Sequence, residues 1–404
     1  MAWLVTPESL RLVGSSSGMS GLLNIVCLGF GLIISLASAF QIHSPKIVNA
    51  GYSSDYKCLS HAYGEISGFT VLLSGRIPFL LFASTGMLVT AGFAFSEIFL
   101  YWFPNFLFAF ILLVLVAVLN MTKSILIFRS QCLFVCLTVA GLAALIVLGA
   151  TTESPVSVNY TGQQNGLSAP LFAVGCVSFL GFDFHKSEQG RGIVMVSLFG
   201  GFLLLALWTV TALKFTSSEI LAESTIAHMI VARAIAGESG RYIMGSVIIF
   251  GVLSGVNGLF IVVRKVFADL KEVRGIPHKI NQNWFVITVI SVTIGLMMLT
   301  GFAGEQILEV RIKASIILWL FYLSLRNYSV CYLLRSEGGA ENYLGYLTGS
   351  VYLLAGAILA ATSSQVIYIF WFILAIMIGT GLLSLTWFTI YNKKWSQKPI
   401  LRRM

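Results

Sequence analysis

The sequence predicts an all-α protein that crosses a membrane about eleven times. Of the 404 residues, 57% are hydrophobic and only 10% are charged, and the mean hydropathy is +0.90. A soluble domain usually carries about 25% charged residues, and one helical crossing takes roughly 20 apolar residues. The apolar residues come in long unbroken runs, whereas the strands of a membrane β-barrel alternate polar and apolar residues. This composition excludes an ordinary soluble enzyme, a disordered chain and a disulfide scaffold.

Eleven apolar runs separated by polar stretches define the predicted spans. They cover residues 19–40, 68–103, 105–121, 131–150, 170–182, 193–213, 242–263, 284–302, 315–334, 344–361 and 366–391. The run 68–103 is too long for an upright crossing, so we expect one long tilted helix there. The connection 214–241 is rich in Ala, Ile and Glu. Because long unstructured loops are uncommon, we expect a short surface helix in this connection.

The distribution of positive charge predicts the orientation. With the C-terminus in the cytoplasm, 17 lysines and arginines fall in inside segments and 6 in outside segments, which is the bias that membrane proteins show. We therefore expect a multi-pass protein of the plasma membrane or a bacterial inner membrane with a cytoplasmic C-terminus. The net charge of +9 forms no basic stripe, so we expect no nucleic-acid partner.

The chain is expected to form a single transmembrane domain, residues 1–404. Within it we expect an N-terminal tail at 1–18, the helical bundle at 19–391 and a basic cytoplasmic tail at 392–404.

A glycine and a carboxylate interrupt the apolar run that begins after Pro170. The run ends in Phe179-Leu180-Gly181-Phe182-Asp183. A helix break at membrane depth frees backbone groups, which are tolerated only where they line a cavity or are buried in protein. Discontinuous helices of this kind form the substrate sites of transporters. Alternatively, Asp183 simply caps the next helix at the cytoplasmic edge of the membrane.

The same segment resembles the sixth helix of the amino acid–polyamine–organocation (APC) permeases. Other segments resemble that family in the same order, over roughly residues 62–391. They are 62–69 with the long span ending at Pro104, 119–131, 255–268 with 275–277, and 323–335. The resemblance implies a LeuT-type bundle of inverted repeats. It also implies a secondary transporter, a permease or exchanger (antiporter), that moves amino acids or related amines by alternating access.

The helix break and the resemblance together point to one set of substrate-binding residues. The candidates are Ser178, Phe179, Leu180, Gly181, Phe182, Asp183, Ser254 and Asn257. The alternative for Ser254 and Asn257 is hydrogen bonding between helices. The run 131–150 contains no lysine of the kind that some proton-coupled relatives use. Exchange or uncoupled movement is therefore expected, with a small amino acid or amine and the lipid bilayer as partners and no cofactor.

The sequence departs from the family at its beginning. The family has two helices before its third, and the first is broken at a Gly/Ser-rich motif; this chain has one full span there. Residues 14–18, Gly-Ser-Ser-Ser-Gly, are either a remnant of that broken helix or an exposed linker, which we favour. Without the first helix, a ligand would be held mainly through its cationic end. The rival hypothesis is a non-transporting membrane subunit that binds a membrane protein partner or a second copy.

Charged residues inside spans are costly and need a role. Arg76 and Arg326 lie within predicted spans, and we expect Arg326 to pair with a carboxylate. The five histidines show no metal-binding spacing, and no nucleophile motif or phosphate-binding loop occurs. An enzyme and a metal site are therefore not predicted.

Overall fold

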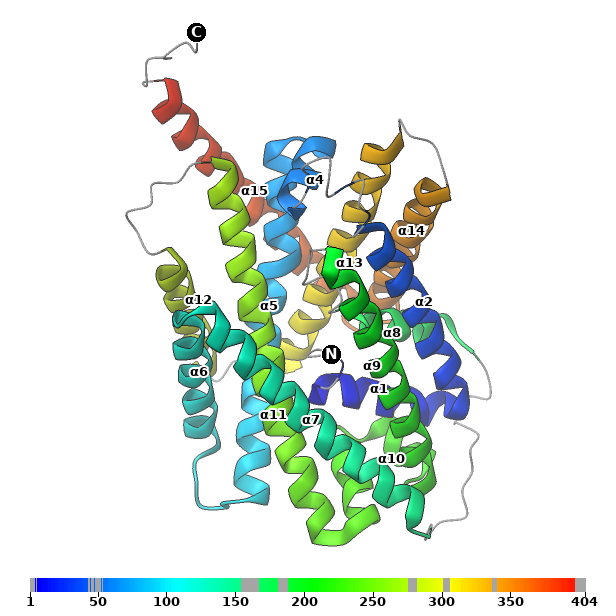
Figure 1. Cartoon of the computed structure of the whole chain (residues 1–404). Coiled ribbons are helices and arrows are strands. Elements are labelled where there is room, and N and C mark those ends of the chain that lie inside the picture. Colours follow the sequence, from blue (N-terminus) through cyan, green and yellow to red (C-terminus); the bar gives the residue numbers. More distant parts are fainter. Residues whose placement is uncertain are drawn as a thin grey trace.

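The chain folds into a bundle of helices (Figure 1). This computed structural model describes Leu4, residues 6–42, Ser44, Ile47, Tyr52, 54–153, 167–180, 188–274, 282–300, 306–335 and 340–396. No strand occurs among these residues, and the prediction of an all-α protein is confirmed.

In the described residues, the predicted spans correspond to α2, to α5 through α9 and to α11 through α15. The short helix α10 lies between α9 and α11. In order, the helices are α1 (Pro7–Ser20), the short 3-10 helix η1 (Gly21–Leu23), α2 (Asn24–Ile42), α4 (Asp55–Tyr63), α5 (Glu65–Ile98), α6 (Asn105–Met121), α7 (Ser124–Thr151), α8 (Ala169–Ser178), α9 (Glu188–Phe215), α10 (Ser218–Glu223), α11 (Ala227–Arg274), α12 (Gln282–Leu299), α13 (Gln306–Leu334), α14 (Ala340–Ala361) and α15 (Val366–Ser396). By length and composition, 7 helical stretches of the described residues can cross a membrane, and α6, α8 and α12 are shorter apolar helices.

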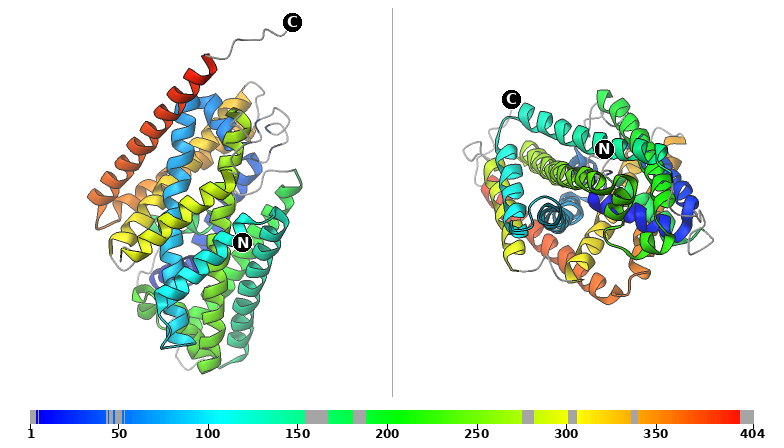
Figure 2. Two further views of the ribbon diagram at one scale, coloured as in Figure 1. Left: turned by 90° about the vertical axis from the view of Figure 1, so that its left-hand side faces the viewer. Right: turned by 90° about the horizontal axis from the view of Figure 1, so that it is seen from below.

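Helices α5 and α11 form the centre of the bundle, and α15 lies at its edge (Figure 2). In their most apolar windows, 61% of α5 and 78% of α11 is buried, against 6% of α15. The 34 residues of α5 form one continuous helix, as predicted, although Pro78 lies inside it. At roughly 1.5 Å per residue, α5 is longer than the roughly 30 Å hydrocarbon core is thick.

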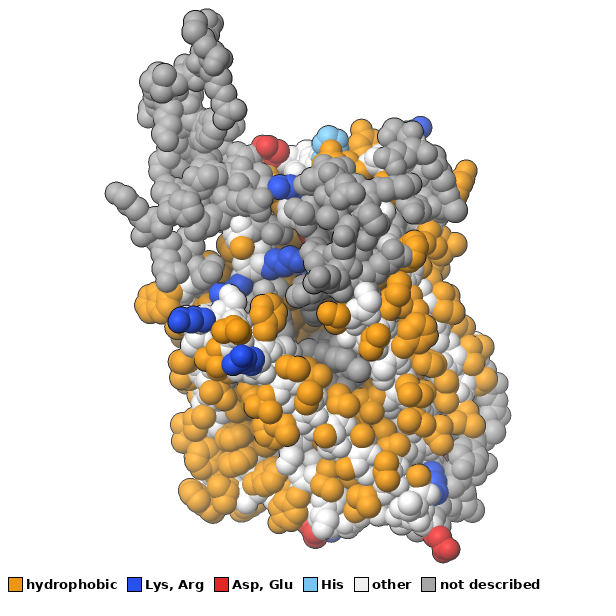
Figure 3. Space-filling view, viewed as in Figure 1, with side chains coloured by type: hydrophobic (Ala, Val, Ile, Leu, Met, Phe, Trp, Pro, Cys, Tyr) orange, Lys and Arg blue, Asp and Glu red, His pale blue; other side chains and the backbone are white. Residues whose placement is uncertain are grey.

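Among the described side chains on the visible face, hydrophobic ones are the most widespread, as is expected of a membrane protein (Figure 3). The acidic side chains on this face lie at its upper and lower ends, and most of the basic ones lie in its upper half. This distribution matches a multi-pass protein whose middle is embedded in lipid.

Helix α11 contains a sharp kink. Ala236 has φ −138° and Gly237 has φ +58°, a backbone conformation that glycine adopts without the cost a side chain would add.

The part of α11 before the kink and the short helix α10 both pack against α1. The surface helix expected in the connection 214–241 is therefore confirmed as α10.

Candidate functional site

Helix α1 begins in the middle of the bundle rather than at its surface (Figures 1 and 2). Thr6 caps it, because the Thr6 hydroxyl accepts a hydrogen bond from the Ser9 backbone N–H at 3.3 Å. Pro7 and Glu8 follow in the first turn, where proline and acidic residues suit a helix start. Thr6 and Ser9 have no exposed surface, so this helix end is enclosed by protein.

Three helices meet at Thr6. A Cβ atom built on Gly255 of α11 would lie 2.7 Å from Thr6 Cγ2 and 3.1 Å from Met87 Sδ of α5. Gly255 therefore has no side chain because α1 and α5 approach the α11 backbone there. On another side, Leu4 packs against Gly201 of α9.

Helix α8 also ends inside the bundle. Its 10 residues stop at Ser178 and span about 15 Å, roughly half of the hydrocarbon core. Phe179 directly after it has no exposed surface. Helix α8 packs on α1 and α2, and the closest approach joins Gly175 to Cys27 and Gly31 of α2. Two helix ends, the start of α1 and the end of α8, thus lie at depth in neighbouring helices.

Several polar side chains on α1 and on the helices that pack against it are enclosed without a hydrogen-bond partner. They are Ser9 Oγ and one carboxylate oxygen of Glu8 on α1, Ser84 Oγ on α5, and His228 Nδ1 on α11. Ser84 lies one turn from Met87 along α5. Leaving a buried polar group unpaired is costly, so such groups call for a ligand, an ion or water.

The predicted site residues at the end of α8 divide into two groups. Ser178 donates to the Val174 carbonyl of its own helix at 3.0 Å, and Phe179 and Leu180 belong to the hydrophobic core. Gly181, Phe182 and Asp183 lie outside the described residues. The structure therefore shows that the helix ends before Gly181, and the role of Asp183 stays a prediction.

Ser254 and Asn257 of α11 belong to a chain of buried amides. Asn120 of α6 donates to Asn257 Oδ1 at 2.7 Å, and Asn257 donates to Gln131 Oε1 of α7 at 2.6 Å. Gln131 in turn donates to the Ser254 carbonyl at 3.0 Å and to its hydroxyl at 3.1 Å. These contacts join three helices, as the alternative interpretation of Ser254 and Asn257 expected.

The expectation that residues 14–18 form an exposed linker is wrong. They lie within α1, and Gly14, Ser16, Ser17 and Gly18 are buried. A Cβ on Gly18 would lie 2.6 Å from the Ser218 carbonyl oxygen, so α10 packs directly on the α1 backbone. The Gly/Ser pattern therefore marks a helix with a small-residue contact face. The sequence reads equally well as a flexible linker because Gly and Ser serve both purposes.

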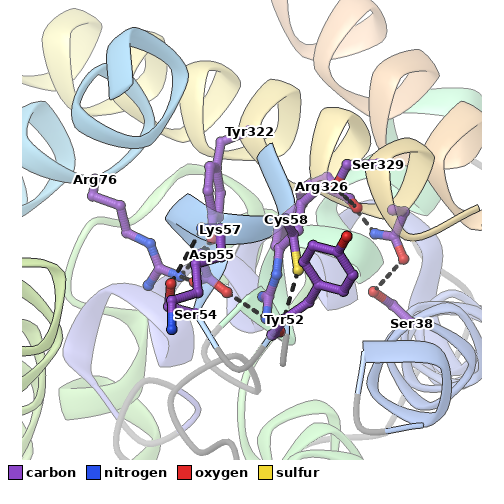
Figure 4. A network of polar contacts seen from close by, with 12 residues as sticks. Ser38, Tyr52, Ser54, Asp55, Lys57, Cys58, Arg76, Tyr322, Arg326 and Ser329 are labelled. Atoms are coloured by element: carbon purple, nitrogen blue, oxygen red, sulfur yellow. Dashed lines mark hydrogen bonds and ion pairs between the residues drawn. The ribbon is translucent and has the colours of Figure 1, made fainter. Parts of the chain in front are cut away.

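A second polar cluster joins α4, α5 and α13 (Figure 4). The Asp55 carboxylate of α4 pairs with Arg326 at 2.8 Å and with Arg76 at 3.1 Å. Tyr322 donates to the same carboxylate at 2.7 Å. The expected carboxylate partner of Arg326 is thus confirmed. Asp55 itself was missed because it lies in a polar stretch between two spans, where a carboxylate is normally solvated.

The comparisons place this fold among known structures. The chain is similar to a manganese transporter of Eremococcus coleocola, solved with an aromatic bis-isothiourea substituted compound, with a TM-score of 0.59. The match covers 97% of this chain and 93% of the other at 12% sequence identity. No family model matches the sequence, and no curated protein is significantly similar to it. The chain thus has the helical-bundle fold of a membrane transporter, and the APC family stays a prediction.

Proposed function

We propose that this protein is a secondary transporter that moves an amino acid or a related amine by alternating access. One observation carries the proposal: the start of α1 and the end of α8 both lie inside the bundle, and buried hydroxyls without a hydrogen-bond partner accompany the start of α1. Discontinuous helices at membrane depth supply backbone groups for binding a substrate. The fold shared with a transporter supports the same conclusion.

The substrate class rests on the sequence resemblance to amino acid permeases. Glu8 places a carboxyl group in the first turn of α1, where one of its oxygens is enclosed without a hydrogen-bond partner, and such a group suits a substrate with an ammonium group. The expectation that a ligand is held mainly through its cationic end assumed that no helix precedes α2. Helix α1 precedes α2, so that assumption does not hold. The rival hypothesis of a non-transporting subunit rested on the same missing helix.

A second candidate substrate is a divalent metal cation, because the structural relative is a manganese transporter. Glu8 would attract such a cation as well. Among the described residues, no group of three or more His, Cys, Asp and Glu side chains is placed to hold a metal ion. The two candidates therefore need a direct comparison.

Uptake by proteoliposomes that contain the purified protein tests the proposal. The substrates are the twenty L-amino acids, their decarboxylated amines and Mn²⁺, each supplied alone. The matched variants are Gly255→Ala, whose Cβ would meet Thr6 and Met87, and Gly379→Ala on α15, where nothing lies within 4 Å of the added atom.

We expect uptake of at least one amino acid or amine, reduced at least tenfold in Gly255→Ala and unchanged in Gly379→Ala. Both variants must elute as the native protein does on size exclusion. Equal uptake by both variants would place the substrate site elsewhere. No uptake of any tested substrate would contradict the transporter.

A further inference from the structure

Two opposite charges lie on one face of α1 without pairing with each other. Glu8 and Arg11 are three residues apart, which makes them neighbours on a helix surface. Arg11 instead donates to Glu309 of α13 at 3.0 Å, while one Glu8 oxygen is enclosed with no hydrogen-bond partner. This face of α1 therefore carries the Glu8 carboxyl group, which has an oxygen without a partner, beside the Arg11 guanidinium group, which is bound to α13.

His228 lies next to the same face. A Cβ on Gly14 of α1 would lie 3.9 Å from the Cβ of Ala227, so the first turn of α11 packs on the α1 turn that follows Arg11. The His228 side chain is 6% exposed, and its Nδ1 atom has no partner. Arg11 lies one turn before Gly14 on α1, and His228 follows Ala227 directly on α11, so Arg11 and His228 come from helix turns that pack on each other.

The ion pair between Arg11 and Glu309 can open, so that Arg11 can bind a different carboxylate. The Glu309 side chain is 69% exposed and the Arg11 side chain 42% exposed. An exposed pair contributes little to stability because water solvates both groups when they separate. Glu309 can therefore be replaced at Arg11 by another carboxylate, and the released Glu309 side chain stays in water.

We propose that Glu8, Arg11 and His228 bind the two charged groups of a zwitterionic α-amino acid. Glu8 receives the ammonium group. Arg11 receives the carboxylate in place of Glu309, and the Nδ1–H of His228 donates a second hydrogen bond to it. This assignment rests on the proposed transport function and narrows its substrate to amino acids with both groups free.

The charge pattern explains why other substrates bind less well. An amine without a carboxylate forms no hydrogen bond with His228 and leaves Arg11 on Glu309, so it gains only the contact with Glu8. A divalent cation at Glu8 meets the positive charge of Arg11 beside it. Sites built to hydrogen-bond a group discriminate strongly against ligands that lack it, so we expect at least a tenfold preference for the amino acid.

The experiment compares the best-transported amino acid with its decarboxylated amine and with Mn²⁺. The full-length protein in proteoliposomes is used as wild type, Arg11→Gln and Glu309→Gln. Arg233→Gln is the matched control, because Arg233 belongs to another exposed ion pair, with Glu238 at 3.5 Å. KM for uptake and calorimetric affinity are both measured.

The two variants of the ion pair separate binding from structure. If Arg11 binds the substrate carboxylate, Arg11→Gln raises KM for the amino acid at least tenfold and leaves KM for the amine unchanged. Glu309→Gln then keeps or lowers KM for the amino acid, because a competing carboxylate is gone. If the pair only holds α1 to α13, both variants change KM alike and the assignment is wrong.

The remaining outcomes distinguish this assignment from the proposed function. Wild-type protein that moves the amine as well as the amino acid overturns the zwitterion site and leaves transport intact. Preferred uptake of Mn²⁺ also overturns the assignment and supports the metal candidate. Wild-type protein that moves none of these substrates contradicts the proposed function itself.

Discussion

Arg326 of α13 and Asp55 of α4 form an ion pair with 2.8 Å between Nη2 and Oδ1, and Arg76 of α5 shares the same carboxylate. One buried aspartate thus holds two buried arginines, which are 1% and 3% exposed. Charges inside a membrane protein are costly unless paired, so this shared carboxylate joins three helices at one point.

Removing the shared carboxylate is expected to destabilise the protein strongly. Asp55→Asn leaves two buried guanidinium groups without their charge partner, which typically costs about 3–5 kcal/mol. The matched control is Glu238→Gln, whose partners Arg233 and Arg241 lie in exposed pairs at 3.5 Å and whose removal should cost under about 1 kcal/mol. Thermal unfolding in detergent measures both variants. Similar melting temperatures for the two would show that the buried cluster contributes little.

The amide chain between α6, α7 and α11 is expected to contribute modestly to stability. Asn257→Ala removes the contacts at 2.7 Å to Asn120 and 2.6 Å to Gln131, and we expect a loss of about 1–2 kcal/mol. Ser246→Ala is the control, because the Ser246 hydroxyl donates to the Tyr242 carbonyl of its own helix. If Asn257→Ala abolishes substrate binding while the melting temperature is unchanged, Asn257 belongs to the substrate site instead.

Two helical glycines, one packed against α10 and one in open space, are expected to respond in opposite ways to substitution by alanine. Gly18→Ala places a Cβ 2.6 Å from the Ser218 carbonyl, so the backbones must separate and the melting temperature should fall. Gly192→Ala on α9 meets nothing within 4 Å and removes glycine from a helix, which should stabilise by up to about 1 kcal/mol. A rise in melting temperature for Gly18→Ala would show that α10 moves away from α1 without cost.

The predicted orientation is tested by labelling at opposite ends of the molecule. Ser396→Cys stands at the end of α15, and Tyr101→Cys replaces a residue that is 92% exposed between α5 and α6. We expect an impermeant thiol reagent applied to intact cells to label the Tyr101→Cys protein and to reach Ser396→Cys only after permeabilisation. The protein without either substitution controls for its own cysteines. The reverse pattern would invert the topology.

The predicted helices and the carboxylate partner of Arg326 both follow from the free energy of burying polar groups in the membrane. An apolar run must form a helix because the bilayer offers no hydrogen-bond partners to the backbone, and a buried arginine must find a carboxylate. Those requirements can be read from sequence without knowing which segments meet. The sequence also predicted that the helix after Pro170 is interrupted at Gly181, and in the structure α8 ends at Ser178, before that residue.

The partners of these groups depended on the tertiary structure. Residues 14–18 have the composition of a linker, and only their contacts with α9, α10 and α11 show that they form a buried helix. Asp55 looks solvated until α5 and α13 surround it. The enclosed start of α1 at Thr6 becomes a candidate site only because Met87 and Gly255 meet it from other helices. Sequence alone therefore determined which segments must avoid water, since that depends on each residue's own free energy of transfer. Which polar groups face one another is a property of helices far apart in the chain, and only their packing decided it.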